Sequence, residues 1–157
     1  FTWTGGCKDG YLDGAGVLQW VVDGKPGARY EGPLVHGYRH GKAIEVIARG
    51  DRYEGMFANN KRNGQGVYIW ADGGRYEGGF RDDRLHGKAI RIWADGTRYE
   101  GDYVDGMRTG KGIYFWSNGD RYVGDFLNNK VHGYGVYTYK DGREMRGRFE
   151  NDSFVGP

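Results

Sequence analysis

The chain has little proline, a single cysteine, no long apolar run and no large excess of one charge. Only 3 of its 157 residues are proline, which excludes a proline-rich linker, and its 31 glycines follow no Gly-X-Y triplet, which excludes collagen. Cys7 has no second cysteine with which to form an intrachain disulfide. No apolar run approaches the roughly 20 residues that a membrane-spanning helix needs. The 23 basic and 21 acidic residues alternate along the chain, so no concentrated basic face predicts a nucleic-acid partner.

Large aliphatic residues are also few, whereas aromatic residues make up 16% of the chain. The aromatic set is dominated by 13 Tyr and 5 Trp. Because a conventional two-layer core needs more aliphatic side chains, we expect aromatic rings to provide most of the apolar burial, on a single sheet.

The segment from Asp51 to Trp70 recurs along the chain, with copies that begin at Gly74, Thr97 and Asp120. The glycine of its Tyr-Glu-Gly motif has equivalents throughout the sequence, at Gly5, Gly32, Gly55, Gly78, Gly101, Gly124 and Gly147. The first spacing is 27 residues and each later one is 23 residues. A fixed period in this range predicts a repeat array, in which each unit buries its apolar face only against its neighbours.

We predict one repeat array over residues 1–157. It begins with an atypical capping repeat at 1–28, continues with regular repeats at 29–51, 52–74, 75–97, 98–120 and 121–143, and ends with a partial repeat at 144–157. The chain starts without methionine and stops inside a repeat, so we expect both ends to be cut or processed. The lack of an export signal therefore leaves the compartment open.

Each regular repeat contains two turn signals. The first is a pair such as Asn59-Asn60, whose residue types tolerate positive φ and suit a two-residue type I′ hairpin. The second follows the Trp position, as in Ala71-Asp72-Gly73, and suits a three-residue loop closed by a left-handed glycine. With a turn every 11 or 12 residues, the predicted fold class is all-β. We expect an elongated, single-layer antiparallel meander of stacked hairpins, open and curled, with no closed barrel.

The odd repeat length predicts which side chains share a face. A 23-residue repeat returns every motif tyrosine to one face only if one connection is even and the other odd, as the two turn signals are. The predicted register in the short hairpins pairs Phe57 with Arg62. It also pairs Gly55 with Gly64. Across the longer loop, it pairs the second glycine of each Gly-x-Gly with the motif glycine of the next repeat.

The same register predicts ion pairs on the opposite face. It places motif glutamates opposite lysines, in the pairs Glu31 with Lys42, Glu77 with Lys88, and Glu100 with Lys111. Such cross-strand pairs of opposite charge favour the assignment.

The rings on the tyrosine face form the candidate site, a trough in which a partner would bind. Its predicted members are Tyr53, Tyr76, Tyr99, Tyr122, Phe57, Phe80, Tyr103, Phe126, Trp70, Trp93, Trp116, Arg62 and Arg108. Contiguous exposed aromatic surface marks interaction sites, and the two arginines add donors for carbonyls, carboxylates or phosphates. The alternative is that the rings only stack on one another to hold a single-layer sheet together.

No pattern predicts a catalytic, cofactor or metal site. His40, His86 and His132 share a repeat position, but they lie in alternate repeats and so roughly 19 Å apart, too far to share a metal ion. Successive motif glutamates are about 10 Å apart, and their predicted lysine partners would keep them all ionised, which is unlike an acid-base pair. We therefore predict that the chain is not an enzyme and needs no cofactor.

The recurring pattern is Tyr-Glu-Gly-x-Phe, a short turn, Gly-x-Gly, and Asp-Gly before the next Arg-Tyr-Glu-Gly. It resembles the MORN (membrane occupation and recognition nexus) repeat over nearly the whole chain. The departures are the first repeat, Ala43 and Ala89 in place of the second glycine, and Glu144-Met145-Arg146 in place of Arg-Tyr-Glu. The resemblance implies an open hairpin array. Such arrays are associated with scaffolding, membrane-proximal assembly and phospholipid contact.

Two hypotheses of function follow. In the first, the chain is a non-enzymatic interaction and scaffold module, and a protein segment or a second copy of the chain occupies the trough. Phospholipid ranks behind protein because the net charge is only +2, and no nucleic acid is expected. In the second, the array is the targeting or regulatory part of a larger enzyme, since MORN-like arrays occur beside lysine methyltransferase and phosphoinositide kinase domains. We expect a soluble chain, and the resemblance adds a place peripheral to a membrane.

Overall fold

The computed structural model describes residues 1–157 as strands, turns and loops, and its strands form one open antiparallel sheet. Consecutive strands are neighbours in a meander, with β2 and β5 paired beside the main path to β3 and β4. The predicted all-β, open antiparallel class is confirmed. No helix in the structure is long and apolar enough to cross a membrane.

The chain divides into two compact units. Unit 1 comprises Phe1–Gly73 with Phe80–Asp83, and unit 2 comprises Gly74–Gly79 with Arg84–Pro157. Unit 1 contains β1 (Thr2–Trp3), β2 (Gly6–Lys8), β3 (Tyr11–Val22), β4 (Lys25–Val35), β5 (Tyr38–Arg39), β6 (Gly41–Val46), β7 (Arg52–Ala58) and β8 (Lys61–Ile69). Unit 2 contains β10 (Arg84–Ile92), β11 (Arg98–Val104), β12 (Met107–Phe115), β13 (Arg121–Leu127), β14 (Lys130–Thr138), β15 (Glu144–Glu150) and β16 (Ser153–Gly156). The residues of β9 (Arg75–Arg81) are divided between the two units.

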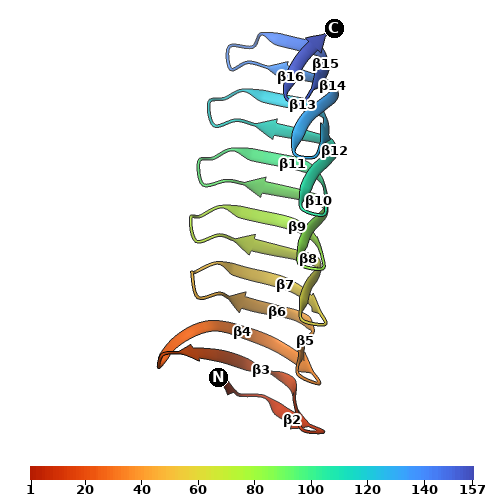
Figure 1. Cartoon of the computed structure of the whole chain (residues 1–157). Helices are drawn as coiled ribbons and strands as arrows, with labels where there is room; N and C mark the ends of the chain where they lie inside the picture. The colour runs from red at the N-terminus through yellow and green to blue at the C-terminus, as the bar shows by residue number, and fades with distance from the viewer. The chain divides into compact units, whose positions relative to one another are not determined.

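Both predicted turn types are present. Asn128 and Asn129 have φ of 50° and 72°, as a type I′ turn requires of both central residues. Gly119 closes a longer loop with φ of 95° and donates its N–H to the Trp116 carbonyl oxygen at 3.0 Å. Within each unit, the short turns lie at one end of the hairpins and the longer loops at the other (Figure 1).

The predicted register of the short hairpins is correct near the turn and wrong beyond it. Phe57 faces Arg62 as predicted, but Gly55 faces Gly66 rather than Gly64. The reason is a β-bulge, in which one residue of β7 lies opposite three residues of β8. Gly64 lies in this bulge with φ of 77°, a left-handed conformation that glycine adopts without strain. The equivalent hairpins of unit 2 have register shifts at the same place.

The register across the longer loops is confirmed wherever both strands lie in one unit. In unit 2, Gly112 faces Gly124 and Gly135 faces Gly147. In unit 1, Ala43 takes the place of the second glycine and faces Gly55.

The predicted pairs of Glu31 with Lys42 and of Glu100 with Lys111 are wrong, because the bulge shifts the second strand of the hairpin. Glu31 faces Ile44, and Glu100 faces Ile113. Each motif glutamate instead pairs with the arginine two residues before it, as in Arg29–Glu31 at 2.8 Å, Arg52–Glu54 at 2.9 Å, Arg75–Glu77 at 2.6 Å and Arg98–Glu100 at 2.6 Å. The lysines pair across the longer loop, as in Lys42–Glu54 at 4.0 Å, Lys88–Asp102 at 3.6 Å and Lys111–Asp125 at 2.6 Å.

The motif tyrosines form the core and explain the glycines around them. Tyr53 is 1% exposed, and its ring covers the facing glycines Gly55 and Gly66. A Cβ atom on either glycine would lie 2.4 to 2.5 Å from Tyr53 atoms, so a larger residue would require the ring to shift. The Tyr53 hydroxyl donates to the carbonyl oxygen of Met56, the residue that the bulge leaves without a partner on β8, at 3.0 Å. Burial raises the pKa of Tyr53 to about 12, so the hydroxyl remains a donor at neutral pH.

The tyrosines and the phenylalanine position of the motif form an edge-to-face stack inside each unit. In unit 1, the Phe57 ring centroid lies 5.4 Å from that of Tyr30 and 5.2 Å from that of Tyr53. In unit 2, the Phe126 ring lies 5.1 Å from Tyr99 and 5.4 Å from Tyr122. Edge-to-face pairs at these separations add stabilisation beyond area burial. The rings therefore hold the sheet together, as the alternative interpretation of the sequence proposed.

Candidate functional site: the half-exposed rings of unit 2

The structure separates the predicted site residues into a buried set and a half-exposed set. The motif tyrosine and phenylalanine positions are at most 5% exposed, at Tyr53, Tyr76, Tyr99, Tyr122, Phe57, Phe80, Tyr103 and Phe126. The tryptophans and arginines are half-buried, at Trp70, Trp93, Trp116, Arg62 and Arg108. Contact of either set with a partner stays a prediction. Only the tryptophans and arginines have substantial solvent-exposed surface with which a partner could make contact.

Sequence reasoning missed a second layer of rings beside the tryptophans. Tyr114 and Tyr137 are half-buried and lie one on each side of Trp116. The Trp116 ring centroid is 4.7 Å from that of Tyr114 and 5.1 Å from that of Tyr137. In unit 1, Tyr68 lies 4.8 Å from Trp70 in the same way. The signal in the sequence is the tyrosine two residues before each of these tryptophans.

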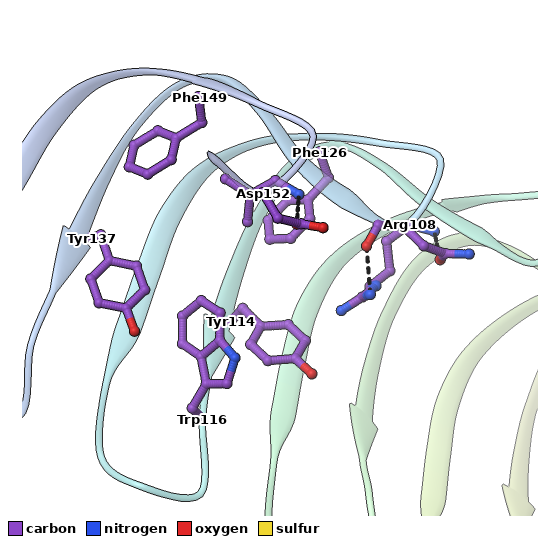
Figure 2. Close-up of a pocket in the computed structure, with 9 residues that line it drawn as sticks. Arg108, Tyr114, Trp116, Phe126, Tyr137, Phe149 and Asp152 are labelled. Carbon is purple, nitrogen blue, oxygen red and sulfur yellow. Dashed lines mark hydrogen bonds between the residues drawn. The ribbon is translucent and has the colours of Figure 1, made fainter. Parts of the chain in front are cut away.

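These rings border a cavity of about 300 Å³ in unit 2. It is lined by Arg108, Tyr114, Trp116, Phe126, Asn129, Val131, Tyr137, Phe149 and Asp152. Figure 2 shows Trp116 between Tyr137 and Tyr114, with Arg108 beyond Tyr114. The volume lies at the lower end of the range of ligand-binding pockets, which are mostly apolar with a few placed polar groups. We call this cavity the Arg108 cavity.

Arg108 is the one cation that lines the cavity. Its guanidinium carbon lies over four ring centroids, those of Tyr114 at 4.9 Å, Tyr99 at 5.6 Å, Trp93 at 5.8 Å and Phe126 at 5.9 Å. All are within the range of cation–π attraction. Its Nη2 donates to the carbonyl oxygen of Asn129 at 2.6 Å, and no carboxylate of the chain forms an ion pair with it.

Two arginines of unit 1 share this repeat position and are neutralised. Arg62 lies 5.2 Å from the Tyr68 ring centroid, and its Nε donates to Asp83 Oδ1 at 3.0 Å. Arg39 lies 5.0 Å from the Phe57 ring centroid and forms an ion pair with Glu45. Arg108 in unit 2 therefore differs from Arg39 and Arg62, because it has no carboxylate partner.

Hydrogen bonds between successive short turns fix the backbone beneath each arginine. The second turn residue accepts from the backbone N–H that lies 21 residues earlier, as Asn129 Oδ1 does from Arg108 at 2.9 Å. The same bond joins Asp83 to Arg62 at 3.0 Å and Asp152 to Val131 at 2.8 Å. Sequence reasoning assigned these Asn and Asp residues only to positive φ, because a contact to the preceding repeat leaves no local signal.

A buried carboxylate orients Tyr137 at the far side of the cavity. The Tyr137 hydroxyl donates to Asp120 Oδ2 at 2.6 Å, and the Lys140 N–H donates to Asp120 Oδ1 at 2.9 Å. These bonds, that from Tyr137 above all, lower the pKa of Asp120. Burial, followed by the bond to Asp120, raises the pKa of Tyr137. Tyr137 is therefore held as a neutral donor in one orientation.

Unit 1 contains a separate cavity of about 610 Å³. It is lined by Leu18, Trp20, Val22, Ala28, Leu34, Gly37, Arg39, Glu45, Ala48 and Asn60. The arginine of this cavity, Arg39, already has partners within the chain. It forms an ion pair with Glu45, and its Nη2 donates to the Asn60 carbonyl oxygen at 2.6 Å.

Comparison with protein-family models agrees with this repeat architecture. The MORN repeat model matches five consecutive segments, residues 30–52, 53–75, 76–98, 99–121 and 122–142, which together cover most of the chain. No curated protein matches the chain. One similar solved structure is the SAS-4 (dCPAP) TCP domain of Drosophila melanogaster in complex with a proline rich motif of Ana2 (dSTIL). It is 14% identical with a TM-score of 0.47, over 78% of this chain and 66% of that one. The MORN repeat is in general a non-catalytic module, and this chain belongs to the MORN repeat family.

Proposed function

We propose that the chain is a non-enzymatic protein-interaction module, which binds an extended peptide segment in the Arg108 cavity. The observation that supports this most is the pair of ring layers in unit 2. The inner rings, such as Tyr99 and Phe126, are buried and hold the sheet together. The outer rings, Tyr114, Trp116 and Tyr137, stay half-exposed around an open cavity. Contiguous exposed aromatic surface of this kind is typical of interaction sites.

The outer rings are suited to capturing a flexible ligand. Tyr and Trp side chains provide a large contact area and lose little conformational entropy on binding. Trp116 is held between two rings, and Tyr137 is fixed by Asp120, so the surface is already ordered before a partner arrives. Preorganisation of this kind improves affinity by reducing the entropy lost on association.

A peptide fits the cavity better than a phospholipid headgroup does. Membrane attraction needs clustered basic residues, each contributing about 1 kcal/mol. The cavity contains a single arginine together with the carboxylate of Asp152. Binding of a loop or terminal segment of a second copy of the chain is an alternative outcome that the tests below distinguish.

Selection of peptides on the intact chain tests this proposal. A phage-displayed library of random peptides is panned on the wild type, and the enriched peptides are titrated by fluorescence anisotropy. We expect Trp116→Ala to weaken them about 10-fold or more, because buried aromatic anchors dominate binding energy. The matched control is Tyr134→Ala, which removes a 65% exposed ring that does not line the cavity. Equal affinity of Trp116→Ala and the wild type would refute the proposal.

Two further measurements separate the other occupants. Light scattering of the wild type and of the triple variant Trp70→Ala, Trp93→Ala, Trp116→Ala shows whether self-association uses the tryptophans. Sedimentation with anionic liposomes over a salt series shows whether lipid binds. Salt-sensitive liposome binding without peptide enrichment would favour lipid over protein.

A further inference from the structure

The surroundings of Arg62 and Arg108 share most of their rings but differ in the charge of the second turn residue. They also differ in the residue that faces the motif tyrosine, which is Glu45 opposite Tyr53 and Arg91 opposite Tyr99. Four ring positions recur 46 residues apart, which is two repeats, as Tyr53 and Tyr99, Tyr68 and Tyr114, Trp70 and Trp116, and Phe80 and Phe126. Trp93, which also lies near the Arg108 guanidinium, has Ile47 at the equivalent position. The second turn residue is Asp83 beside Arg62 and Asn129 beside Arg108. Arg62 thus has a carboxylate partner within the chain, whereas Arg108 has none.

The missing carboxylate leaves Arg108 with unused donors at the edge of the cavity. A guanidinium has five N–H donors, and Arg108 spends one of them on the Asn129 carbonyl oxygen. The rings beneath it also displace water from one side of the cation. A charge-assisted hydrogen bond to an anion is stronger in such a partly desolvated place than in water.

We propose that Arg108 anchors a carboxylate of the bound peptide, which is an Asp or Glu side chain or the C-terminal group. This inference rests on the proposed function and adds the chemistry of the partner. The carboxylate takes the place that Asp83 fills beside Arg62, and a neighbouring apolar side chain of the peptide lies against Trp116 and Tyr137. The guanidinium fork suits a carboxylate in bidentate geometry.

The other charge in the cavity favours a carboxylate over a phosphate. Asp152 lines the same cavity, where it accepts the Val131 N–H, and it adds one negative charge. The nearby carboxylates Asp120 and Asp125 are held by Tyr137 and Lys111 respectively. A phosphate group carries about −1.5 to −2 charges at neutral pH, which one arginine beside Asp152 does not balance. A carboxylate carries one charge, and Asp152 is free to accept a backbone N–H of the peptide.

The variant Asn129→Asp tests the proposal because it copies the chemistry beside Arg62. Asp83 adopts φ of 68° at the equivalent position and Asn129 adopts φ of 72°, so aspartate fits the turn without strain. The new carboxylate would neutralise Arg108 while leaving the arginine and all the rings in place. The matched control is Asp83→Asn, which makes the reverse change in unit 1 and does not touch the Arg108 cavity.

The experiment is parallel selection of random peptides on the wild type and on Asn129→Asp. We expect peptides enriched on the wild type to share a carboxylate next to an apolar residue. Replacing that Asp or Glu by its amide should weaken binding to the wild type about 10-fold or more. Asn129→Asp should bind the acidic peptide about 10-fold more weakly and lose the preference for acid over amide. Asp83→Asn should bind it at least as tightly as the wild type does.

Three other results would contradict the carboxylate anchor at Arg108. Apolar peptides without an acid, bound equally by Asn129→Asp, would refute the carboxylate anchor and leave the proposed function intact. No enrichment on the wild type beyond that on Trp116→Ala would refute both. Sedimentation of phosphatidylinositol phosphate vesicles by the wild type but not by Asn129→Asp, without an acidic peptide motif, would replace the peptide carboxylate by a lipid phosphate.

Discussion

Unit 1 and unit 2 use the same ring framework but treat the arginine above it differently. Arg39 and Arg62 are each paired with a carboxylate of their own chain, whereas Arg108 lies over four rings with only the Asn129 carbonyl oxygen as acceptor. The hairpins of Arg62 and Arg108 have a register shift at the equivalent place, and their second turn residues have φ of 68° and 72°, so the difference between these two lies in the side chains. A repeat array can thus keep one ring framework and vary the charge beside an equivalent arginine from one unit to the next.

The largest expected effect is on the free energy of unfolding, and it concerns the packing of tyrosine rings on glycines that the two units share. We expect Gly66→Ala in unit 1 and Gly112→Ala in unit 2 each to lower the free energy of unfolding by about 2 to 3 kcal/mol. The new methyl group would lie 2.5 Å from Tyr53 in the first variant and 2.7 Å from Tyr99 in the second. Urea denaturation followed by tyrosine and tryptophan fluorescence measures both losses.

The control for this prediction is Gly27→Ala, whose methyl group would be 3.4 Å from its nearest neighbour and should be nearly neutral. A large loss in one unit and none in the other would show that the ring stack is not equivalent in the two units. The comparison of Arg62 with Arg108 would then lose its common background.

A second test measures stability at acidic pH, because the partners of the buried loop carboxylates Asp51 and Asp120 differ between the units. Asp51 in unit 1 accepts from Arg49 Nε at 2.8 Å and from the Tyr68 hydroxyl at 2.6 Å. The bond from Arg49, followed by that from Tyr68, lowers the pKa of Asp51 from 3.8 to about 2. In unit 2, Asp120 has the matching tyrosine bond and no arginine, and its pKa is lowered as well.

The sign of the effect follows from these shifts. A carboxyl group with a depressed folded-state pKa stabilises the protein above its unfolded pKa, and this contribution is lost as the pH falls through the folded value. For Asp51 the window runs from about pH 4 to about pH 2. We expect the urea midpoint of the wild type to fall more steeply in this window than that of Asp51→Asn. Parallel curves for the two proteins would contradict the assignment.

More of the fold than of the candidate site could be predicted from the sequence. Turn types follow from local residues such as Asn128-Asn129, and the shared face of the tyrosines follows from the parity of the repeat. The bulge at Gly64 was missed, because a left-handed glycine and a glycine beneath a ring look alike in a sequence. Gly64 and Gly66 play these two different roles only two residues apart.

Part of the lining of the Arg108 cavity could be expected from the sequence. Trp116 and Arg108 follow from the face assignment, and both line the cavity. The buried state of rings such as Tyr99 was an open alternative, because a sequence pattern does not say how many ring layers one face carries. The role of Asn129 could not be found, since it depends on a hydrogen bond to a residue 21 positions earlier.

The smallest expected effect is also the most direct test of the charge difference. Asn129→Asp should form with Arg108 the ion pair that Asp83 forms with Arg62, and Asp83→Asn should remove that pair. Both sites are partly exposed, so each change should alter the free energy of unfolding by at most about 1 kcal/mol, with a gain for Asn129→Asp and a loss for Asp83→Asn. Because salt screens exposed charges, raising the salt from 0.05 to about 1 M should reduce both changes.

Urea denaturation of the wild type, the two single variants and the double variant at low and high salt measures these changes. The double variant should have nearly wild-type stability, because it only moves the carboxylate from one equivalent arginine to the other. If Asn129→Asp instead destabilises the chain as much as Asp83→Asn does, Arg108 does not accept a carboxylate in the position that Asp83 occupies beside Arg62. The unpaired arginine would then be a feature of ring packing in unit 2, and the charge difference between the units would have no bearing on a partner.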